Sequence, residues 1–261
     1  ADIIVCESTY GDRDHPKMSG SEKELLDHVQ RVCVEQQGRL IIPAFSVGRT
    51  QEILYALNKF FNEGKLPRVP VFVDSPLSIN ATAIYRKYSE LLQADIREEL
   101  KTDADLFAFP DVEFIREAWR SKELNTRKGP SITIAASGMM DAGRIRHHLF
   151  HGLPDPRNAI LIVGFCAPGT LGAHLLERPA HVRIYGEEIP VRAAILRMDS
   201  YSAHADRNEL LRWIGCQDPT LVNQVFLVHG VDHALQGLRD LYAEHGFRKI
   251  AIPTQGQRFE V

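Results

Sequence analysis

Short runs of apolar residues alternate along this chain with longer segments in which apolar residues recur every three or four positions. A short apolar run that no polar residue interrupts is typical of a strand buried on both faces of a sheet. The predicted strands are Ile3–Cys6, Leu40–Phe45, Val71–Val73, Ile132–Ala136, Ile160–Val163 and Val225–Val228.

The longer segments have the period of an amphipathic helix. In residues 21–38, for example, Leu25, Leu26, Val29 and Val32 fall on one helical face. The other predicted helices are Arg49–Phe61, Asn80–Leu92, the residues after Ala136 through about His151, Leu171–Glu177, Asp206–Ile214 and Ala234–His245.

This alternation of strand and helix predicts an α/β fold with a mostly parallel, Rossmann-like sheet that helices cover on both faces. Two regions depart from the alternation. Val182–Tyr185 and Val191–Leu196 flank Gly186 and predict a β-hairpin. Residues 96–128 are charged and give no clear assignment.

The composition narrows the class of protein. With 44% hydrophobic and 25% charged residues, the 261-residue chain is neither disordered, collagen-like nor a coiled coil. No apolar run reaches the roughly 18 residues of a membrane span, and the first residues lack the layout of a signal peptide. The net charge of −3 argues against nonspecific coating of nucleic acid, although a local basic groove remains compatible with it.

The cysteines favour a reducing compartment. Cys6, Cys33, Cys166 and Cys216 are far apart in the sequence and form no CxxC pair, so neither a disulfide framework nor a zinc site of that type is supported. A cytoplasmic protein is therefore expected.

Polar residues collect at the carboxyl ends of the predicted strands, which is the edge where open α/β sheets bind their ligands. His204 directly precedes a predicted helix, where the helix dipole favours an anion such as phosphate. Asp206 and Glu209 have the spacing of a helix cap, so Asp206 is expected to be structural. The residues that follow the strands are Glu7, Ser46, Asp74, Ser137 and His229.

Three loops have residues suited to a phosphate group: Ser46-Val47-Gly48-Arg49, Ser137-Gly138 and Gly169-Thr170. Glycine permits close approach of the backbone, and Arg49 adds a bidentate charge. The same residues are also common at ordinary strand–helix junctions, so the pattern leaves both interpretations open.

Histidines offer a second kind of chemistry. His229 is placed either as a metal ligand or acid–base group, or as a hydrogen-bonded histidine at a strand–helix junction. His147, His148 and His151 suggest zinc, but no HExxH pattern surrounds them. A polar helix face is the better interpretation of these three.

Taken together and in order, five motifs carry a resemblance to a known family. The chain resembles the β-CASP branch of the metallo-β-lactamase superfamily, RNA-processing nucleases that include the cleavage-and-polyadenylation type, and its SAHAD motif is closest to that type. The motifs are Glu7-Ser8-Thr9-Tyr10-Gly11, Pro43-Ala44-Phe45-Ser46-Val47-Gly48-Arg49, Ser137-Gly138-Met139, Ser202-Ala203-His204-Ala205-Asp206 and Val228-His229-Gly230.

The resemblance implies roles for individual residues. Glu7 would orient a neighbouring histidine, and His204 would protonate the leaving oxygen or neutralise phosphate charge. His229 would bind one of two zinc ions that share a hydroxide. RNA would be the substrate, with Ser46, Arg49, Ser137, Gly138, Gly169 and Thr170 as the candidate substrate-binding residues.

The resemblance also implies a division into domains. Residues 12–195 correspond to the β-CASP domain, inserted into a partial metallo-β-lactamase αββα domain made of residues 1–11 and 196–261. The family's HxHxDH motif, which precedes the ESTYG motif, does not occur in this chain. A smaller departure is Val231, which stands where the family usually has an acidic residue.

Because one histidine cannot hold catalytic zinc, we expect this polypeptide alone to bind no zinc at the catalytic site and to cleave nothing. We also expect an upstream half of the metallo-β-lactamase domain to be missing. The strands near 1–7, 193–199 and 225–229 would then share an uncovered apolar face, closed by that half or by a homodimer.

Three functions remain open from the sequence. The first is a metal-dependent ribonuclease, of which this chain is the carboxyl portion. The second is a non-catalytic RNA-binding or scaffold subunit, disfavoured because an inert scaffold has no chemical need for Glu7, His204 and His229 together. The third is a nucleotide or small-molecule binder, disfavoured because no strand is followed by GxGxxG.

Overall fold

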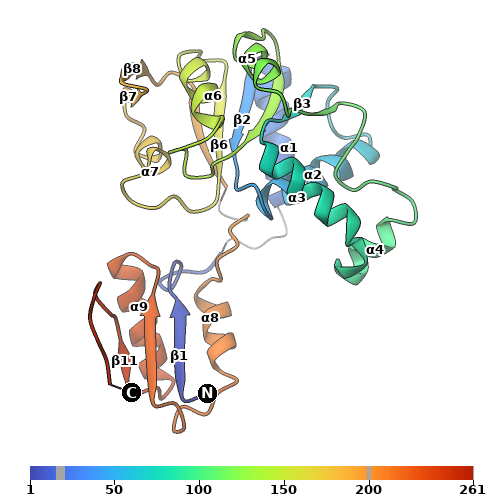
Figure 1. The fold of residues 1–261 in the computed structure, drawn as a ribbon. Coiled ribbons are helices and arrows are strands. Elements are labelled where there is room, and N and C mark those ends of the chain that lie inside the picture. The colour runs from blue at the N-terminus through green and yellow to red at the C-terminus, as the bar shows by residue number, and fades with distance from the viewer. Residues whose placement is uncertain (16–20, 199–200, 261) are drawn as a thin grey trace. The chain divides into compact units, whose positions relative to one another are not determined.

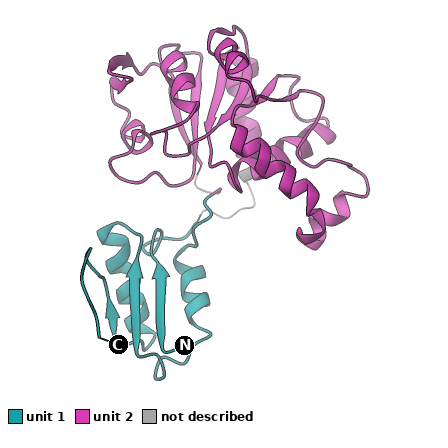
Figure 2. Ribbon diagram, in the orientation of Figure 1, with its two compact units in different colours: residues 1–16, 202–261 teal, residues 17–201 magenta. Residues whose placement is uncertain are grey.

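The computed structural model describes residues 1–15, 21–198 and 201–260, and it divides the chain into two compact units. The smaller unit comprises residues 1–16 and 202–261, and the larger unit residues 17–201 (Figure 2). These divisions lie five or six residues from the domain boundaries expected from the sequence, at 11/12 and 195/196. Each unit is described by itself below.

A parallel six-stranded sheet forms the centre of the larger unit (Figure 1). Its strand order is β4-β3-β5-β2-β6-β9, and each neighbouring pair runs in the same direction. The predicted α/β, mostly parallel fold is therefore confirmed. The strands are β2 (Arg39–Pro43), β3 (Val71–Val73), β4 (Val112–Phe114), β5 (Ser131–Ala135), β6 (Ala159–Val163) and β9 (Ala194–Met198).

Helices cover both faces of this sheet. α1 (Ser21–Val29), the π-helical η1 (Gln30–Glu35), α2 (Arg49–Asn62) and α3 (Pro76–Lys87) pack against one face. The other face is covered by α5 (Ala118–Thr126), α6 (Ile145–Gly152) and α7 (Leu171–Leu176). The short η2 (Ser89–Leu91) and α4 (Ala94–Glu99) complete the helices of this unit.

The apolar runs are continuous because the sheet has two buried faces. Along β2, Leu40 and Ile42 enter the core on the side of α2, whereas Ile41 enters the core on the side of α6. Side chains alternate between the two faces of a strand, so a strand that is covered on both faces is apolar at most positions.

The predicted hairpin exists, but its second strand is Glu187–Pro190 and not Val191–Leu196. β7 (His181–Ile184) pairs with β8 (Glu187–Pro190), and both turn residues, Tyr185 and Gly186, have positive φ, as expected of a two-residue hairpin turn. Residues 194–198 instead form β9 at the edge of the six-stranded sheet, paired with β6. The expectation that this strand shares an uncovered face with the strands near 1–7 and 225–229 is therefore wrong.

The smaller unit has a three-stranded parallel sheet of order β1-β10-β11. Its elements are β1 (Ile3–Glu7), α8 (Arg207–Ile214), β10 (Gln224–Val228), α9 (Asp232–Glu244) and β11 (Ile250–Ala251). Both helices pack on one side of the sheet, where Ile4 and Leu227 are buried against Leu238 and Tyr242. On the other side Val5 is 62% exposed, so this side of β1 is an open apolar surface.

Among the residues that the structure describes, no helix combines the length and the apolar character that crossing a membrane would require.

Candidate functional site

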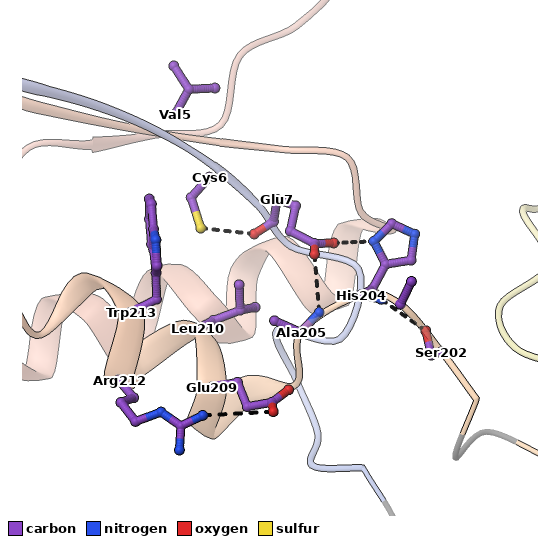
Figure 3. Close-up of a pocket in the computed structure, with 11 residues that line it drawn as sticks. Val5, Cys6, Glu7, Ser202, His204, Ala205, Glu209, Leu210, Arg212 and Trp213 are labelled. Atoms are coloured by element: carbon purple, nitrogen blue, oxygen red, sulfur yellow. Dashed lines mark hydrogen bonds and ion pairs between the residues drawn. The ribbon is translucent and has the colours of Figure 1, made fainter. Parts of the chain in front are cut away.

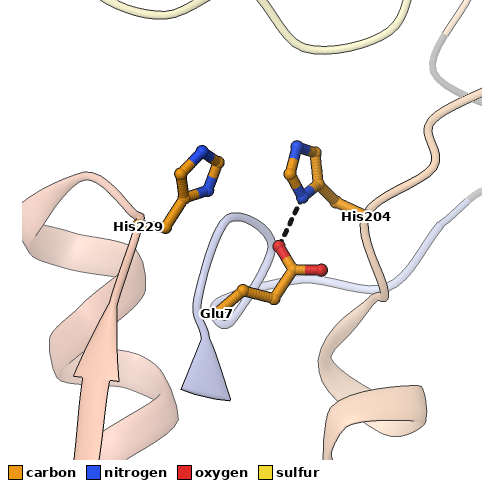
Figure 4. Close-up of side chains that lie close together, drawn as sticks. All are labelled: Glu7, His204 and His229. Carbon is orange, nitrogen blue, oxygen red and sulfur yellow. Dashed lines mark hydrogen bonds and ion pairs between the residues drawn. The ribbon is translucent and has the colours of Figure 1, made fainter. Parts of the chain in front are cut away.

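Parallel pairing of β1 and β10 brings Glu7 and His229 together at the carboxyl edge of the small sheet. Glu7, the last residue of β1, pairs in register with Val228, the last residue of β10, and His229 follows directly. His204 comes from the loop before α8. Three residues that are 25 to 222 positions apart in the sequence thus lie side by side (Figure 4).

The carboxylate of Glu7 holds the loop that carries His204. One oxygen, Oε2, lies 2.5 Å from Nδ1 of His204. The other, Oε1, accepts a hydrogen bond of 3.2 Å from the backbone N–H of Ala205 (Figure 3). Because Nδ1 is engaged with Glu7, the other ring nitrogen of His204 points away from the carboxylate (Figure 4).

Thr9 joins the carboxylate to the second imidazole. Its hydroxyl lies 2.8 Å from Oε2 of Glu7 and 2.9 Å from Nδ1 of His229. An ionised carboxylate only accepts hydrogen bonds, so Thr9 donates to Glu7 and accepts from Nδ1–H of His229. This assignment places the proton of neutral His229 on Nδ1 and leaves Nε2 with a lone pair, the form in which a histidine binds a metal.

The backbone at His229 lies close to the loop after β1. His229 has a φ of 52°, in the left-handed region, and its carbonyl accepts a hydrogen bond of 3.2 Å from the N–H of Ser8. A Cβ added to Gly230 would lie 2.7 Å from the Ser8 carbonyl oxygen. Glycine at position 230 therefore allows the loop after β10 to approach the loop after β1 this closely.

Asp206 caps α8, as the sequence predicted. Its side chain accepts a hydrogen bond from the N–H of Glu209, and the Glu209 side chain accepts one from the N–H of Asp206, which is a complete capping box. Burial alone would raise the pKa of Asp206, but hydrogen bonds from the backbone of Glu209 and His15 lower it overall. Asp206 is thus an ionised structural residue that fixes the loop next to His204.

An open pocket of about 670 Å³ adjoins this cluster (Figure 3). Its wall is polar at Glu7, Ser202 and His204 and apolar at Val5 and Trp213. The two imidazole rings of His204 and His229 stack with their centroids 4.9 Å apart. Both histidines are solvent-accessible, as groups that meet a substrate must be.

The cluster fits part of a metal site. One potential ligand atom each from Glu7, His204 and His229 lie within 4.8 Å of one another, and the described residues contain no other group of three or more such side chains. A metal-binding histidine characteristically has its second nitrogen held by the protein, as Thr9 holds Nδ1 of His229. Zinc takes three or four protein ligands, and in this cluster Glu7 and His204 are already bonded to each other.

The structure places the predicted substrate-binding loops at the carboxyl edge of the larger sheet. Ser46 follows β2, and its hydroxyl lies 3.2 Å from that of Ser75. A Cβ on Gly138 would lie 3.0 Å from the ring of Phe45, so the loops after β2 and β5 are in contact. Ser137 begins the second of these loops, and its hydroxyl donates to the carbonyl of Ala142.

Two of the remaining predicted substrate-binding residues, Arg49 and Thr170, have structural partners. Arg49 is 7% exposed, forms an ion pair with Glu52 and lies over the ring of Tyr201. Thr170 accepts from the N–H of Ala173 as the N-cap of α7, and Gly169 before it has a φ of 84°. Substrate binding by these residues stays a prediction.

A buried polar cluster in the larger unit was not anticipated. Asp74, after β3, is fully buried and bonds His148 Nε2 and Arg144 Nη1, each at 2.7 Å, and the Ser121 hydroxyl at 2.6 Å. Burial raises the pKa of Asp74, but these partners together lower it below its usual value. The prediction of a polar helix face is thus wrong for His148, which is 1% exposed.

The roles of Thr9 and Asp74 were not predicted, although the position of each in the sequence gives a weak signal. Thr9 stands two positions after Glu7, the spacing that returns a side chain to the same side of an extended segment. Asp74 directly follows a wholly apolar strand. Neither signal identifies the partner, because His229 and His148 lie 220 and 74 positions away.

Comparison with known proteins agrees with this geometry. Residues 50–175 match the Beta-Casp domain, and residues 188–253 match the domain described as the Zn-dependent metallo-hydrolase RNA specificity domain. The chain belongs to the β-CASP family of the metallo-β-lactamase superfamily, which confirms the resemblance found in the sequence.

Named relatives lie in bacteria, archaea and animals. The chain is 37% identical over 98% of its length to Ribonuclease TTHA0252 of Thermus thermophilus, covering 58% of that protein. It is 34% identical over 82% of its length to the RNase J-like protein of Methanocaldococcus jannaschii, covering 48% of it. It is 30% identical over 91% of its length to Cleavage and polyadenylation specificity factor 73 of Drosophila melanogaster, covering 34%. The chain thus spans a third to three fifths of these relatives.

Proposed function

We propose that this chain is the RNA-holding portion, with part of the active site, of a zinc-dependent ribonuclease that hydrolyses phosphodiester bonds. The observation that carries the proposal is the convergence of Glu7, His204 and His229, with Nδ1 of each imidazole held by another side chain. Names of the relatives, among them a ribonuclease and a cleavage factor, support RNA as the substrate.

In this proposal His204 is the general acid. A hydrogen bond to the Glu7 carboxylate fixes the orientation of the imidazole. The outward ring nitrogen can then give its proton to the oxygen that leaves phosphorus, which avoids expulsion of an alkoxide. Glu7 acts through His204 and is a positioning residue.

His229 is the metal ligand in this proposal, and Nε2 is the ligating atom because Thr9 holds Nδ1. A pair of zinc ions, when bound, would supply an activated water and neutralise charge on the phosphate. We further propose that the polypeptide of residues 1–261 is inactive alone, because His229 is the one zinc ligand that this proposal assigns among the described residues, and zinc needs three or four.

The proposal assigns RNA binding to the larger unit. Ser46, Ser137 and Gly138, in two loops that touch each other, are the better-placed candidates for contact with phosphate. A cytoplasmic location, an upstream half of the metallo-β-lactamase domain and a homodimer stay predictions. The open apolar side of β1 at Val5 supports a covering partner.

The test of this proposal compares the polypeptide of residues 1–261 with the longest product of its gene. We expect the longer product to cleave a labelled single-stranded RNA and to lose this activity when a chelator removes its metal. The shorter polypeptide should contain far less than one zinc per chain by elemental analysis and should leave the RNA intact. RNA cleavage by residues 1–261 alone would contradict the proposed inactivity, and a longer product that neither binds zinc nor cleaves RNA would favour the scaffold function.

Replacement of Thr9 by valine should weaken zinc binding to the longer product by about 10–100-fold. Valine keeps the shape of threonine but removes the hydroxyl that lies 2.9 Å from Nδ1 of His229. Zinc affinity is measured by competition with a chromogenic chelator. Thr9→Ser keeps the hydroxyl and is the matched control, so equal affinities of the valine and serine variants would show that the bridge has no such role.

A further inference from the structure

A basic groove lies between α5 and α6 in the larger unit. It has a volume of about 330 Å³, within the usual range of small-ligand sites. Its charged lining is wholly basic: Lys122 comes from α5, Arg144 precedes α6, and His147 and His151 come from one face of α6. Ser121 and Asn125 add polar groups, and no carboxylate lines the groove.

Two of these histidines differ from the others in the described part of the chain. Neither His147 nor His151 has a side-chain hydrogen bond or ion pair with another described residue. His147 contacts the ring of Tyr185, and His151 contacts the ring of Phe150. By contrast, four other histidines of the described chain each lie beside a carboxylate. The pairs are His28–Glu24, His174–Glu177, His181–Glu188 and His233–Asp12.

Burial and nearby positive charge together disfavour protonation of both imidazoles. Burial, the largest cause, lowers the pKa of His147 and that of His151 below the usual value of about 6.5. Coulombic repulsion adds to the effect, from His148, Arg146 and Lys122 at His147, and from Arg39, His147 and His148 at His151. The nearby carboxylate of Asp74 opposes it at His147, but Asp74 is already bonded to Arg144 and His148.

Asn125, which also lines the groove, has an amide oxygen without a partner among the described residues. This oxygen is also out of contact with solvent. An amide can turn over and present its NH₂ group to an oxygen acceptor instead.

We propose that the groove between α5 and α6 binds a phosphate group of RNA through Lys122, His147 and His151. An anion there would supply the negative charge that the groove lacks and would accept hydrogen bonds from both imidazoles and the ammonium group. The site is separate from the Glu7–His204–His229 cluster, which belongs to the smaller unit. This inference rests on the proposed function only in taking RNA as the molecule that carries the phosphate.

Phosphate binding at this groove should depend on pH. A bound anion favours the protonated imidazoles, so it raises the pKa of His147 and that of His151. By linkage, the affinity for phosphate should increase as the pH falls through the range between the pKa values of the bound and free forms. In the free protein the pKa values of both histidines lie below about 6.5.

The first test uses inorganic phosphate and the chain of residues 1–261. Imidazole NMR signals of His147 and His151 should shift saturably with phosphate, and their titration midpoints should rise, whereas those of His174 and His181 should not. Zinc alone is the second arm, because two histidines one helical turn apart can also bind a metal. Signals that respond to zinc and not to phosphate would overturn the proposal, as would signals that respond to neither.

The second test uses a short fluorescent single-stranded RNA and measures its anisotropy. The variant His147→Gln/His151→Gln should bind roughly tenfold more weakly at pH 6, with a smaller loss at pH 8. Its salt dependence should become shallower by about one unit. The control His174→Gln/His181→Gln should bind as the parent does. If phosphate binds but RNA affinity is equal in both variants, the groove takes a free phosphate and the RNA assignment is wrong, while cleavage assays judge the nuclease function independently.

Discussion

Replacement of His204 by alanine is expected to lower the rate of RNA cleavage by about 10²–10⁴-fold, the usual contribution of a general acid. Glu7 holds Nδ1 of this histidine at 2.5 Å, so the outward nitrogen is the proton donor in the proposed function. The rate is measured under single-turnover conditions in an RNA-cleaving form of the protein, and zinc content is measured in the same samples.

A change of leaving group separates acid catalysis from simple positioning. A phosphodiester with a nitrophenolate leaving group needs little protonation, so His204→Ala should slow its hydrolysis far less than it slows RNA cleavage. His245→Ala is the control, because His245 lies at the end of α9 and bonds the Leu241 carbonyl. An unchanged rate with RNA, or an equal loss with both substrates, would show that His204 is not the acid.

Replacement of Asp74 by alanine should lower the free energy of unfolding of the larger unit by about 3–5 kcal/mol, the cost of leaving buried partners without their counter-charge. His148 is buried, and Arg144 bonds Asp74 as well as two backbone carbonyls. Urea unfolding followed by circular dichroism measures the change. Glu113→Ala removes an exposed ion pair with Arg120 and should cost at most about 1 kcal/mol.

The contribution of Asp74 should also depend on pH in a defined direction. The folded protein lowers the pKa of Asp74, so the folded state favours the ionised carboxylate. This contribution is fully present above the unfolded value of about 3.9 and is lost as the pH falls through the lower, folded value. The difference in stability between the parent and Asp74→Ala should therefore shrink in acid; a difference that is constant from pH 7 to pH 3 would contradict the assignment.

Much of the fold could be predicted because a buried parallel sheet imposes a simple pattern. β3 and β6 are predicted by uninterrupted apolar runs, and α2 by its apolar face. The second strand of the hairpin was misplaced because Val191 continues an apolar run, whereas Glu187 and Glu188 in β8 are exposed and carry no apolar signal. Residues 96–128 gave no assignment because their helices and β4 are short and half-exposed.

In the candidate site, too, some residues could be predicted from the sequence and others could not. Glu7, His204 and His229 were identified from motifs, and the structure places them together. Thr9 and the pair Asp74–His148 were given no role. The role of a hydroxyl or of a buried ion pair depends on the residue that it bonds. When the two residues are far apart in the sequence, no local pattern indicates that they meet.

The sequence by itself determined the α/β class, the family and the three side chains of the cluster, because periodicity and motifs are local properties of the chain. Only the tertiary structure decided that β9 belongs to the larger sheet, that Thr9 holds Nδ1 of His229 and that His148 is buried against Asp74. Strand order and buried hydrogen bonds depend on which segments meet after folding, and that is set by packing over the whole molecule.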